Sequence, residues 1–381
     1  MTLTIASRGV LAERVANKAM FFANGLGVGA WAASIPLLKA RLDLSAGSLS
    51  LALLAFAIGA VCSMPIAGLA APRASAGQAT RIGALGWTLS LALPDFAPTL
   101  PILIGVAFVM GATNGMLDVA MNGQASSIET RWGSPIMSSF HAVFSIGGLC
   151  GAGLGALVAG LDAPVSALRA AAIVNFVLLV VAWAPLEWGR RSAPASARLA
   201  APGREALLLC FCVCLSFLAE GSVGDWSAVY LNSVVGASPQ AAALGFAGFS
   251  AMMVTGRLIG DRLTARFGRV AMVRGGAALA AIGLALAALV PLPAAGIVGF
   301  ALVGAGLSNV VPVFFGAAGR LAASPAAGVA MAATSGYAGL LFGPPIIGVI
   351  ATALGLRVAL VFIVACAAIV ALAAGRALAR G

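Results

Sequence analysis

Twelve apolar stretches, each long enough to cross a lipid bilayer, fill almost the whole of this sequence. A transmembrane helix needs about 20 mostly apolar residues. Of the 381 residues, 61% are hydrophobic and only 9% are charged, whereas a soluble domain carries about 25% charged residues. The pattern therefore predicts an all-helical membrane protein. The expected spans are roughly 15–38, 46–71, 79–97, 99–127, 135–160, 165–188, 206–232, 239–260, 270–291, 293–320, 325–352 and 356–378.

The 22 basic residues are distributed unevenly around these spans. If both termini are cytoplasmic, only Lys39, Arg41, Arg169 and Arg357 lie outside, and all the others lie inside. This asymmetry is the positive-inside pattern of membrane proteins. It explains the formal net charge of +11 without a nucleic-acid partner. We expect a multi-pass protein of the bacterial cytoplasmic (inner) membrane, monomeric in the lipid bilayer, with both termini in the cytoplasm.

The sequence contains no motif of an enzyme or of an ATP-driven pump. No Gly-rich loop carries the Lys of a nucleotide-binding site. Cys210, Cys212 and Cys214 alternate at a spacing that scatters them around a helix, which disfavours a metal site. We therefore expect no enzyme activity, no cofactor and no bound metal, and we expect transport to draw its energy from an ion or solute gradient.

Several short patterns occur twice, at nearly the same separation along the chain. The matching pairs are Asn24-Gly25 with Glu220-Gly221, Gly29-Ala30-Trp31 with Gly224-Asp225-Trp226, Pro72-Arg73 with Asp261-Arg262, and Ser134-Pro135 with Ser324-Pro325. They predict two six-span halves of parallel topology, residues 1–188 and 206–381, joined by an Arg- and Pro-rich cytoplasmic linker at 189–205. Duplicated halves around a midplane cavity are the architecture of secondary transporters.

The segment RLIGDRLTARFGRV (257–270) resembles the loop signature of the major facilitator superfamily. It departs from that signature by having Arg257 where the first Gly is expected, and by extra residues before Gly268. The first-half copy, GLAAPRASAG (68–77), keeps Arg73 but has Pro72 in place of the acid. The resemblance implies the twelve-helix major facilitator fold, in which spans one, four, seven and ten line a central cavity.

A narrower resemblance lies in DVAMNGQASSIETRWGSPIMSSFHAVFSIGGLCGAG (118–153) and LAEGSVGDWSAVYL (218–231). Both segments look like the subgroup around MosC, which is associated with rhizopine, an inositol-derived amine. That subgroup is distantly similar to fucose-type sugar symporters. The resemblance implies a small polar solute as the substrate.

Polar residues within the four cavity-lining spans are the first candidates for binding solute or protons. They are Asn24 in span one, Asn114, Asp118 and Asn122 in span four, Glu220 in span seven, and Asn309 in span ten. The three residues of span four recur every fourth position, so they share one helix face. An unsatisfied polar group in lipid costs several kcal/mol, so this face must contact protein or a wet cavity.

Glu220 and Asp225 lie in an apolar run whose local sequence offers neither acid a cationic partner. Glu220 is roughly 21 Å into its span at about 1.5 Å per residue, which is near the membrane midplane. Asp225 falls nearer the periplasmic interface, beside Trp226 and Tyr230. We expect Glu220 to take and release a proton during transport, because acids in midspan are mostly functional. The alternative is a structural tie between helices. Asp225 is also a candidate for substrate or proton coupling, and it is equally compatible with a structural role in which it is solvated or caps a broken helix.

Asp118 and His141 form a second candidate pair. They lie at similar distances from the turn between spans four and five, so they could touch across antiparallel helices. His141 is the only histidine, and imidazole can titrate at physiological pH. The pair would then hold a proton or a positive charge in the cavity wall. The alternative is a neutral hydrogen bond that locks the two helices.

The loop between spans eight and nine contributes Asp261, Arg262, Arg266, Gly268 and Arg269. Together with Arg73 of the first half, these residues are expected to latch the halves in an outward-facing state. The alternative reading is that they are orientation signals and solvated loop charges.

Three functions remain open from the sequence. The first is a proton-coupled secondary transporter that imports a sugar, polyol or amino-polyol by alternating access. The second is a proton-driven efflux antiporter in which Glu220 and Asp118 bind an amphipathic or cationic compound. The third, a membrane sensor or scaffold that transports nothing, is disfavoured by the absence of any sizeable loop domain.

Overall fold

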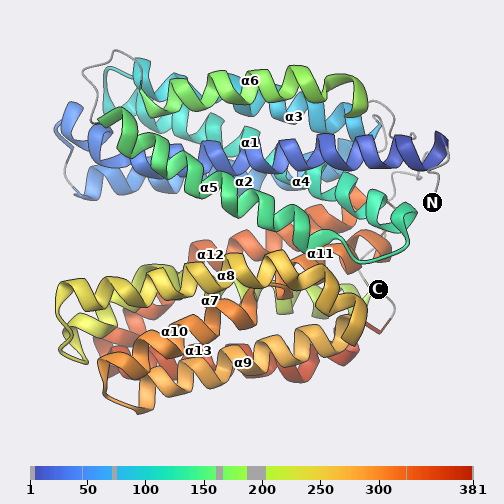
Figure 1. Ribbon diagram of the computed structural model, residues 1–381. Helices are drawn as coiled ribbons and strands as arrows, with labels where there is room; N and C mark the ends of the chain where they lie inside the picture. The colour runs from blue at the N-terminus through green and yellow to red at the C-terminus, as the bar shows by residue number, and fades with distance from the viewer. Residues whose placement is uncertain are drawn as a thin grey trace. The chain divides into compact units, whose positions relative to one another are not determined.

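The computed structural model describes residues 5–44, 46–70, 75–159, 166–186, 203–322 and 324–379, and within these ranges all regular structure is helical (Figure 1). The helices are α1 (Ile5–Arg41), α2 (Ala46–Ala70), α3 (Ala76–Leu91), α4 (Leu100–Trp132), α5 (Met137–Ala159), α6 (Ala167–Leu186), α7 (Arg204–Ser233), α8 (Pro239–Phe267), α9 (Arg269–Leu289), α10 (Pro293–Leu307), α11 (Val310–Leu321), α12 (Pro325–Leu354) and α13 (Leu356–Ala377). A short 3-10 helix, η2 (Leu93–Phe96), follows α3.

The predicted twelve-span fold is confirmed. Each predicted span coincides with one helix, except that span ten is formed by α10 and α11 together and is interrupted at Ser308 and Asn309. The third span was predicted to end at residue 97, but α3 ends at Leu91. The chain then turns into η2, which has Pro94 in its first turn, and proline lacks the amide hydrogen that a continuing helix would need.

Nine helices of the described residues are long and apolar enough to cross a membrane by length and composition alone, with α10 and α11 counted together. The exceptions are α1, α3 and α8. Of these, α3 has 16 residues, and α1 and α8 each carry several charged side chains. The polar content of α1 and α8 is informative, because both helices contribute buried charged residues to the sites described below.

The chain divides into two compact units. The first comprises the described parts of residues 1–133, 140–199 and 322–331, and the second those of 134–139, 200–321 and 332–381. The expected linker at 189–205 lies outside the described residues up to residue 202, and α7 already begins at Arg204. The predicted division at 1–188 and 206–381 therefore stays a prediction.

The same order of helix neighbours recurs in each unit. In the first, α4 packs on α2 and α3, and α6 packs on α1 and α3. In the second, α10 packs on α8 and α9, and α13 packs on α7 and α9. Figure 1 shows α1 beside α6 in the first unit. Helix α2 of the first repeat thus corresponds to α8 of the second, as the repeated sequence patterns indicate.

Glycines bring α1 and α5 into close contact in the first unit. A Cβ atom on Gly25 would overlap the carbonyl oxygen of Phe144, and one on Gly151 would overlap that of Leu26. In the second unit, a Cβ on Gly339 of α12 would overlap the carbonyl oxygen of Cys214 on α7. Small residues at such crossings let helix backbones approach in a membrane, where packing and not water exclusion holds helices together.

Two arginines hold the turn that contains η2. Arg41 at the end of α1 donates to the carbonyl oxygens of Asp95 at 2.6 Å and Pro94 at 2.7 Å. The Asp95 carboxylate accepts from Arg169 at the start of α6 at 2.8 Å, and also from the Ser166 hydroxyl. The ends of α1, α3 and α6 are thereby fixed to one another within the first unit.

Candidate functional site

The polar face of α4 is buried. Asn114, Asp118 and Asn122 are all shielded from solvent, as predicted from their spacing. Asn122 donates through Nδ2 to the Asp118 carboxylate at 3.1 Å and to the Asp118 carbonyl oxygen at 2.9 Å. These hydrogen bonds fix the carboxylate along the helix axis, with one oxygen held by Asn122.

Several oxygen atoms on this face and on the adjoining face of α1 have no hydrogen-bond partner among the described residues. They are Oδ1 of Asn24, Oδ1 of Asn114, Oδ2 of Asp118 and Oδ1 of Asn122. All are acceptors, and buried acceptors are nearly always satisfied by a donor in a functioning protein. The wall formed by α1 and α4 can therefore accept hydrogen bonds from the hydroxyl or amino groups of a solute.

The polar contact of α1 with α4 extends beyond the residues that we predicted. Asn17 donates to the Met121 carbonyl oxygen at 3.0 Å, and Nδ2 of Asn24 approaches the Met121 sulfur at 3.9 Å. Sequence analysis did not single out Asn17, although it lies within the predicted first span, because it sits next to charged residues at the start of that span. Its spacing of seven residues from Asn24 would have placed the two on one helix face.

A buried acid also lies on α1. Glu13 is almost fully buried and pairs with Arg131 of α4 at 2.7 Å, while Gln124 donates to its other oxygen at 3.1 Å. Sequence analysis counted Arg131 only among the basic residues of the cytoplasmic side. Its side chain ties the end of α4 to α1 inside the first unit.

His141 of α5 lies edge-on to Phe21 of α1, with ring centroids 5.5 Å apart. The hydrogen-bond partner that the structure gives Asp118 is Asn122. The proposed contact between Asp118 and His141 stays a prediction.

Glu220 of α7 has a cationic partner on the neighbouring helix. Nη2 of Arg257 on α8 lies 3.5 Å from Oε1 of Glu220. Sequence analysis placed Arg257 among the cytoplasmic basic residues and found no partner for Glu220, because only residues nearby in sequence were considered. Arg257 is buried in the second unit and lies within α8, not in a loop. The clue was its unusual position in the loop signature, where a glycine is expected.

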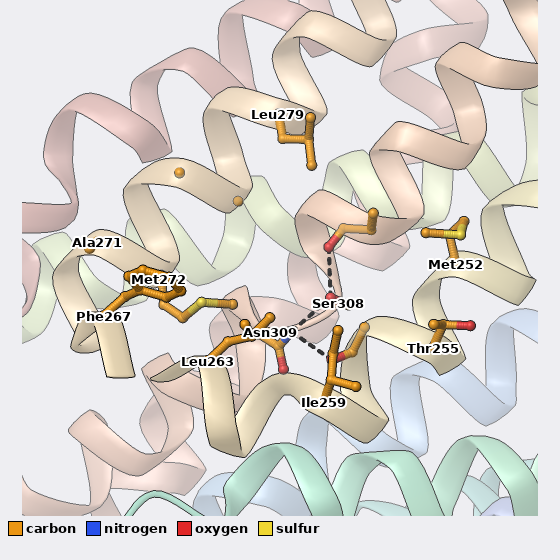
Figure 2. A pocket seen from close by; sticks show the side chains of 14 residues that line it. Met252, Thr255, Ile259, Leu263, Phe267, Ala271, Met272, Leu279, Ser308 and Asn309 are labelled. Atoms are coloured by element: carbon orange, nitrogen blue, oxygen red, sulfur yellow. Dashed lines mark hydrogen bonds between the residues drawn. The ribbon is translucent and has the colours of Figure 1, made fainter. Parts of the chain in front are cut away.

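Arg257 also contacts the interruption between α10 and α11. Its Nε donates to the Ser308 carbonyl oxygen at 3.4 Å. Next to it, Nδ2 of Asn309 donates to the Gly256 carbonyl oxygen at 3.0 Å and to the Ser308 hydroxyl at 2.9 Å (Figure 2). A Cβ at Gly260 would overlap the Asn309 side chain, so α8 is shaped to receive it. At this interruption the Ser308 carbonyl oxygen thus accepts a hydrogen bond from Arg257, the arginine that pairs with Glu220.

A cavity of about 390 Å³ lies between α8, α9 and α10 beside this interruption (Figure 2). Ser308, Asn309 and Thr255 are the hydroxyl- and amide-bearing side chains of a wall that is otherwise apolar. Large apolar side chains in the wall, Ile259 and Phe267, are exposed, and in a membrane such exposed surface faces lipid. We do not assign a polar solute to this cavity.

Asp225 is exposed, unlike the candidates on α4. Trp226 beside it is half-buried. Tyr230 is fully buried against neighbouring helices and donates to the carbonyl oxygens of Ala287 at 3.0 Å and Ala288 at 3.3 Å, and its expected position at the membrane interface stays a prediction. The different surroundings of Glu220 and Asp225 agree with separate roles for the two acids.

The segment predicted as the loop between spans eight and nine is mostly helical, since α8 continues to Phe267, and Asp261 stands out within it. Both of its carboxylate oxygens accept from the backbone amide of Ser139, each at 3.2 Å, within the second unit. Ser139 lies in the first turn of α5, where amide groups lack partners within the helix and favour an acid. Gly268 has a left-handed φ of 82° and separates α8 from α9.

The remaining loop candidates are basic. Arg262 and Arg266 are exposed, and Arg266 lies 5.4 Å from the centroid of the Phe267 ring. Arg269 is half-buried at the start of α9. Arg73 and Pro72 lie outside the described residues.

Twelve helical spans in two six-helix repeats, with paired charges inside the helices, define the chain as a secondary transporter of the membrane. The family model of the Major Facilitator Superfamily matches residues 19–332. The chain belongs to this superfamily, and it is a multi-pass transporter and not an enzyme.

Two relatives match nearly the whole chain. An uncharacterized MFS-type transporter of Yersinia pestis is 40% identical over 354 residues, covering 92% of this chain and 91% of the relative. Membrane protein MosC of Rhizobium meliloti is 34% identical over 356 residues, covering 91% and 85%. The resemblance to the MosC subgroup is thereby confirmed.

Two solved structures share the fold. The transporter FucP, in the outward conformation, superposes with a TM-score of 0.77 at 16% identity, covering 96% of this chain and 98% of that one. The proton:xylose symporter XylE, bound to 6-bromo-6-deoxy-D-glucose, gives a TM-score of 0.74 at 11% identity, covering 96% and 95%.

Proposed function

We propose that this protein is a proton-coupled transporter of a small polar solute of the sugar, polyol or amino-polyol type, with Glu220 as the group that carries the proton. The observation that carries the proposal is the pairing of Glu220 with Arg257 inside the spans of the second unit. Arginine keeps its positive charge throughout, so the acid is the partner whose charge changes. A proton on Glu220 therefore removes the negative charge that this acid places beside a buried cation, which favours a rearrangement.

The chemistry of the first unit supports a polar solute. The buried oxygens of Asn24, Asn114 and Asn122 are acceptors, and sugars and polyols present many hydroxyl donors. The names of two structural neighbours point the same way, since FucP is described as a fucose:proton symporter and XylE as a proton:xylose symporter. We place the protein in the cytoplasmic membrane with both termini inside, and we take it to act as a monomer.

One atom supports the second candidate function, efflux of a cationic compound. Oδ2 of Asp118 is buried and has no hydrogen-bond partner among the described residues. A carboxylate oxygen in this state can attract the ammonium group of a cationic compound, as an efflux antiporter requires. The same atom can equally accept a hydrogen bond from a solute hydroxyl or amine.

The first experiment is a thermal-shift screen of the purified protein. The probes are L-fucose, D-xylose, myo-inositol, an amino-inositol and the lipophilic cation tetraphenylphosphonium. A ligand at 100 times its Kd stabilises the folded state by about 2.7 kcal/mol, so a specific solute raises the unfolding temperature measurably. Stabilisation by a polyol or sugar supports the symporter. Stabilisation by tetraphenylphosphonium alone would support efflux.

The second experiment is uptake of the stabilising solute by proteoliposomes with an imposed pH gradient. The wild-type protein should accumulate solute when the outside is more acidic, and a protonophore should abolish accumulation. Glu220→Gln should still bind solute and exchange it across the membrane without accumulating it. Accumulation by this variant that responds to the pH gradient as the wild type does would reject Glu220 as the proton carrier.

A further inference from the structure

Three aromatic rings from different helices of the second unit meet one helical turn before Glu220. The ring of Phe217 on α7 stacks on that of Phe315 on α11, with centroids 6.3 Å apart and planes 26° apart. The ring of Tyr337 on α12 lies 6.0 Å from that of Phe217 and is tilted by 37° to it. We call these three residues the aromatic cluster.

The rings of the aromatic cluster are not equally buried. Phe315 is 1% exposed, whereas Phe217 and Tyr337 are half-buried. Gly336 lets the Phe217 ring lie against α12, because a Cβ atom there would be 2.6 Å from Cδ2 of Phe217. Phe217 is therefore fixed between Phe315 and the backbone of α12, and it still keeps part of its surface accessible.

The accessible part of Phe217 lies beside Glu220. The two residues are three positions apart on α7, so their side chains are neighbours on the helix surface. The Glu220 side chain is 27% exposed, and an acid within a membrane span faces protein or water and not lipid. The exposed part of Glu220 therefore faces a water-accessible space, and a solute that reaches the acid also contacts Phe217.

An acid beside an aromatic surface suits a solute that has a polar rim and an apolar face. In the six-membered ring of a sugar or a cyclic polyol, hydroxyl groups point out from the rim and C–H groups cover the faces. The oxygens make these C–H hydrogens partly positive, and the negative face of an aromatic ring attracts them. An open-chain polyol has no such fixed face, and ordering its chain costs conformational entropy on binding.

Aromatic faces also attract cations, so the charge beside the cluster decides which ligand is favoured. Nη2 of Arg257 lies 3.5 Å from the Glu220 carboxylate. A cationic solute at Glu220 would therefore be placed close to a second positive charge, and like charges brought together cost several kcal/mol. The aromatic cluster thus favours an uncharged ring.

We propose that the aromatic cluster is a subsite that makes the transporter select an uncharged sugar or polyol with a six-membered ring over an open-chain polyol. The proposal rests on the proposed function and narrows its substrate class. Phe217 and Tyr337 contact the apolar face of the solute ring, and Phe315 positions Phe217. The Glu220 carboxylate accepts hydrogen bonds from the hydroxyl groups of the rim.

The test compares ring and open-chain solutes of matched composition. The pairs are myo-inositol with D-sorbitol, which have equal numbers of carbon atoms and hydroxyl groups, and L-fucose with L-fucitol. Each affinity is obtained from the concentration dependence of the unfolding temperature of the purified protein. The wild type should bind the ring member of at least one pair about ten-fold more tightly, because only the ring offers the aromatic contact.

Two variants should weaken this preference. Phe217→Leu should lower affinity for the ring several-fold and leave affinity for the open chain unchanged. Gly336→Ala keeps all three rings but displaces that of Phe217, so it should weaken the preference in the same direction. Tyr337→Phe, which keeps the ring, should retain the preference.

The matched control is Phe211→Leu. Phe211 is an exposed aromatic residue on the same helix, outside the aromatic cluster, so its substitution should change neither affinity. The unfolding temperature of each variant without solute shows whether it is folded.

Equal affinity of the wild type for both members of each pair, or binding of neither ring, would overturn the proposal. So would a preference that folded Phe217→Leu and Gly336→Ala retain in full, or stabilisation by tetraphenylphosphonium alone. Proton coupling is measured separately, by uptake under a pH gradient. Selection of rings without proton-dependent accumulation would remove the coupling and leave the subsite, whereas proton-coupled uptake that prefers an open-chain polyol would remove the subsite alone.

Discussion

Arg257 and Glu220 approach to 3.5 Å although they belong to different helices of the second unit. The two side chains are not equally buried, because that of Arg257 is 9% exposed and that of Glu220 is 27% exposed. The arginine has the greater need of its partner, since a buried cation without a counter-charge is strongly destabilising. Glu220, which is more accessible, is the partner that a proton or a solute can reach.

The pair predicts a coupled effect on stability. Glu220→Gln and Arg257→Met should each lower the unfolding temperature, and the double variant should be more stable than the two losses added together predict. Residues in direct contact typically show interaction energies of about 0.5–3 kcal/mol in such a cycle. Thermal unfolding of the detergent-solubilised wild type, the two single variants and the double variant measures this interaction energy. Additive losses would mean that the two side chains do not interact.

Because α1 packs closely on α5, two glycines of α5 should respond oppositely to substitution by alanine. Gly151→Ala should lower the unfolding temperature markedly, because its Cβ would overlap the Leu26 carbonyl oxygen and force the helices apart. Gly153→Ala should be tolerated or stabilising, since nothing lies within 4 Å of a Cβ there and alanine favours a helix by about 1 kcal/mol. Equal effects of the two substitutions would contradict the close packing of α1 on α5.

The turn at η2 predicts a structural role for Asp95. Asp95→Asn should weaken its bonds to Arg169 and Ser166 and lower the stability of the protein. The Arg169 side chain is 41% exposed, so we expect a loss of only about 1 kcal/mol. Arg357→Gln, which alters an exposed arginine, is the matched control and should have little effect. A thermal unfolding series distinguishes them, and transport by Asp95→Asn should remain.

Substitution of Asp118 should distinguish the two candidate functions by its effect on ligand affinity. In Asp118→Asn the amide oxygen can still accept from Asn122, so the fold should be retained. A polyol or sugar should bind several-fold more weakly, whereas a cationic compound should lose nearly all affinity because its counter-charge is gone. Titration of the stabilising ligand in the thermal-shift assay measures both. Unchanged affinity for either ligand would remove Asp118 from the binding site.

The fold could be predicted because lipid leaves few alternatives. Every backbone amide must be bonded within the membrane, so long apolar stretches become helices, and the repeated patterns then identify the halves. Glu220 could be singled out for a related reason, since an acid within an apolar span is rarely kept without a role. The buried face of α4 followed from the spacing of Asn114, Asp118 and Asn122.

The partners of these residues could not be predicted in the same way. Arg257 is close to Glu220 only because α7 packs on α8, and a count of basic residues in loops treats it as an orientation signal. Glu13 was hidden for a similar reason, since a charged segment before an apolar stretch is typical of a solvated flank. The interruption at Ser308 and Asn309 has a local signal that the sequence analysis did not use, because Pro312 has no amide hydrogen to bond the carbonyl oxygen of Ser308 four residues earlier.

Solute-induced proton movement tests the central claim most directly. Proteoliposomes loaded with a pH-sensitive dye, with no imposed gradient, receive a pulse of the solute that stabilised the protein in the thermal-shift screen. The account predicts that the interior acidifies with the wild-type protein. It predicts no acidification with Glu220→Gln, although this variant still exchanges labelled solute. Solute entry by the wild-type protein without any acidification, or equal acidification by Glu220→Gln, would contradict proton coupling through Glu220.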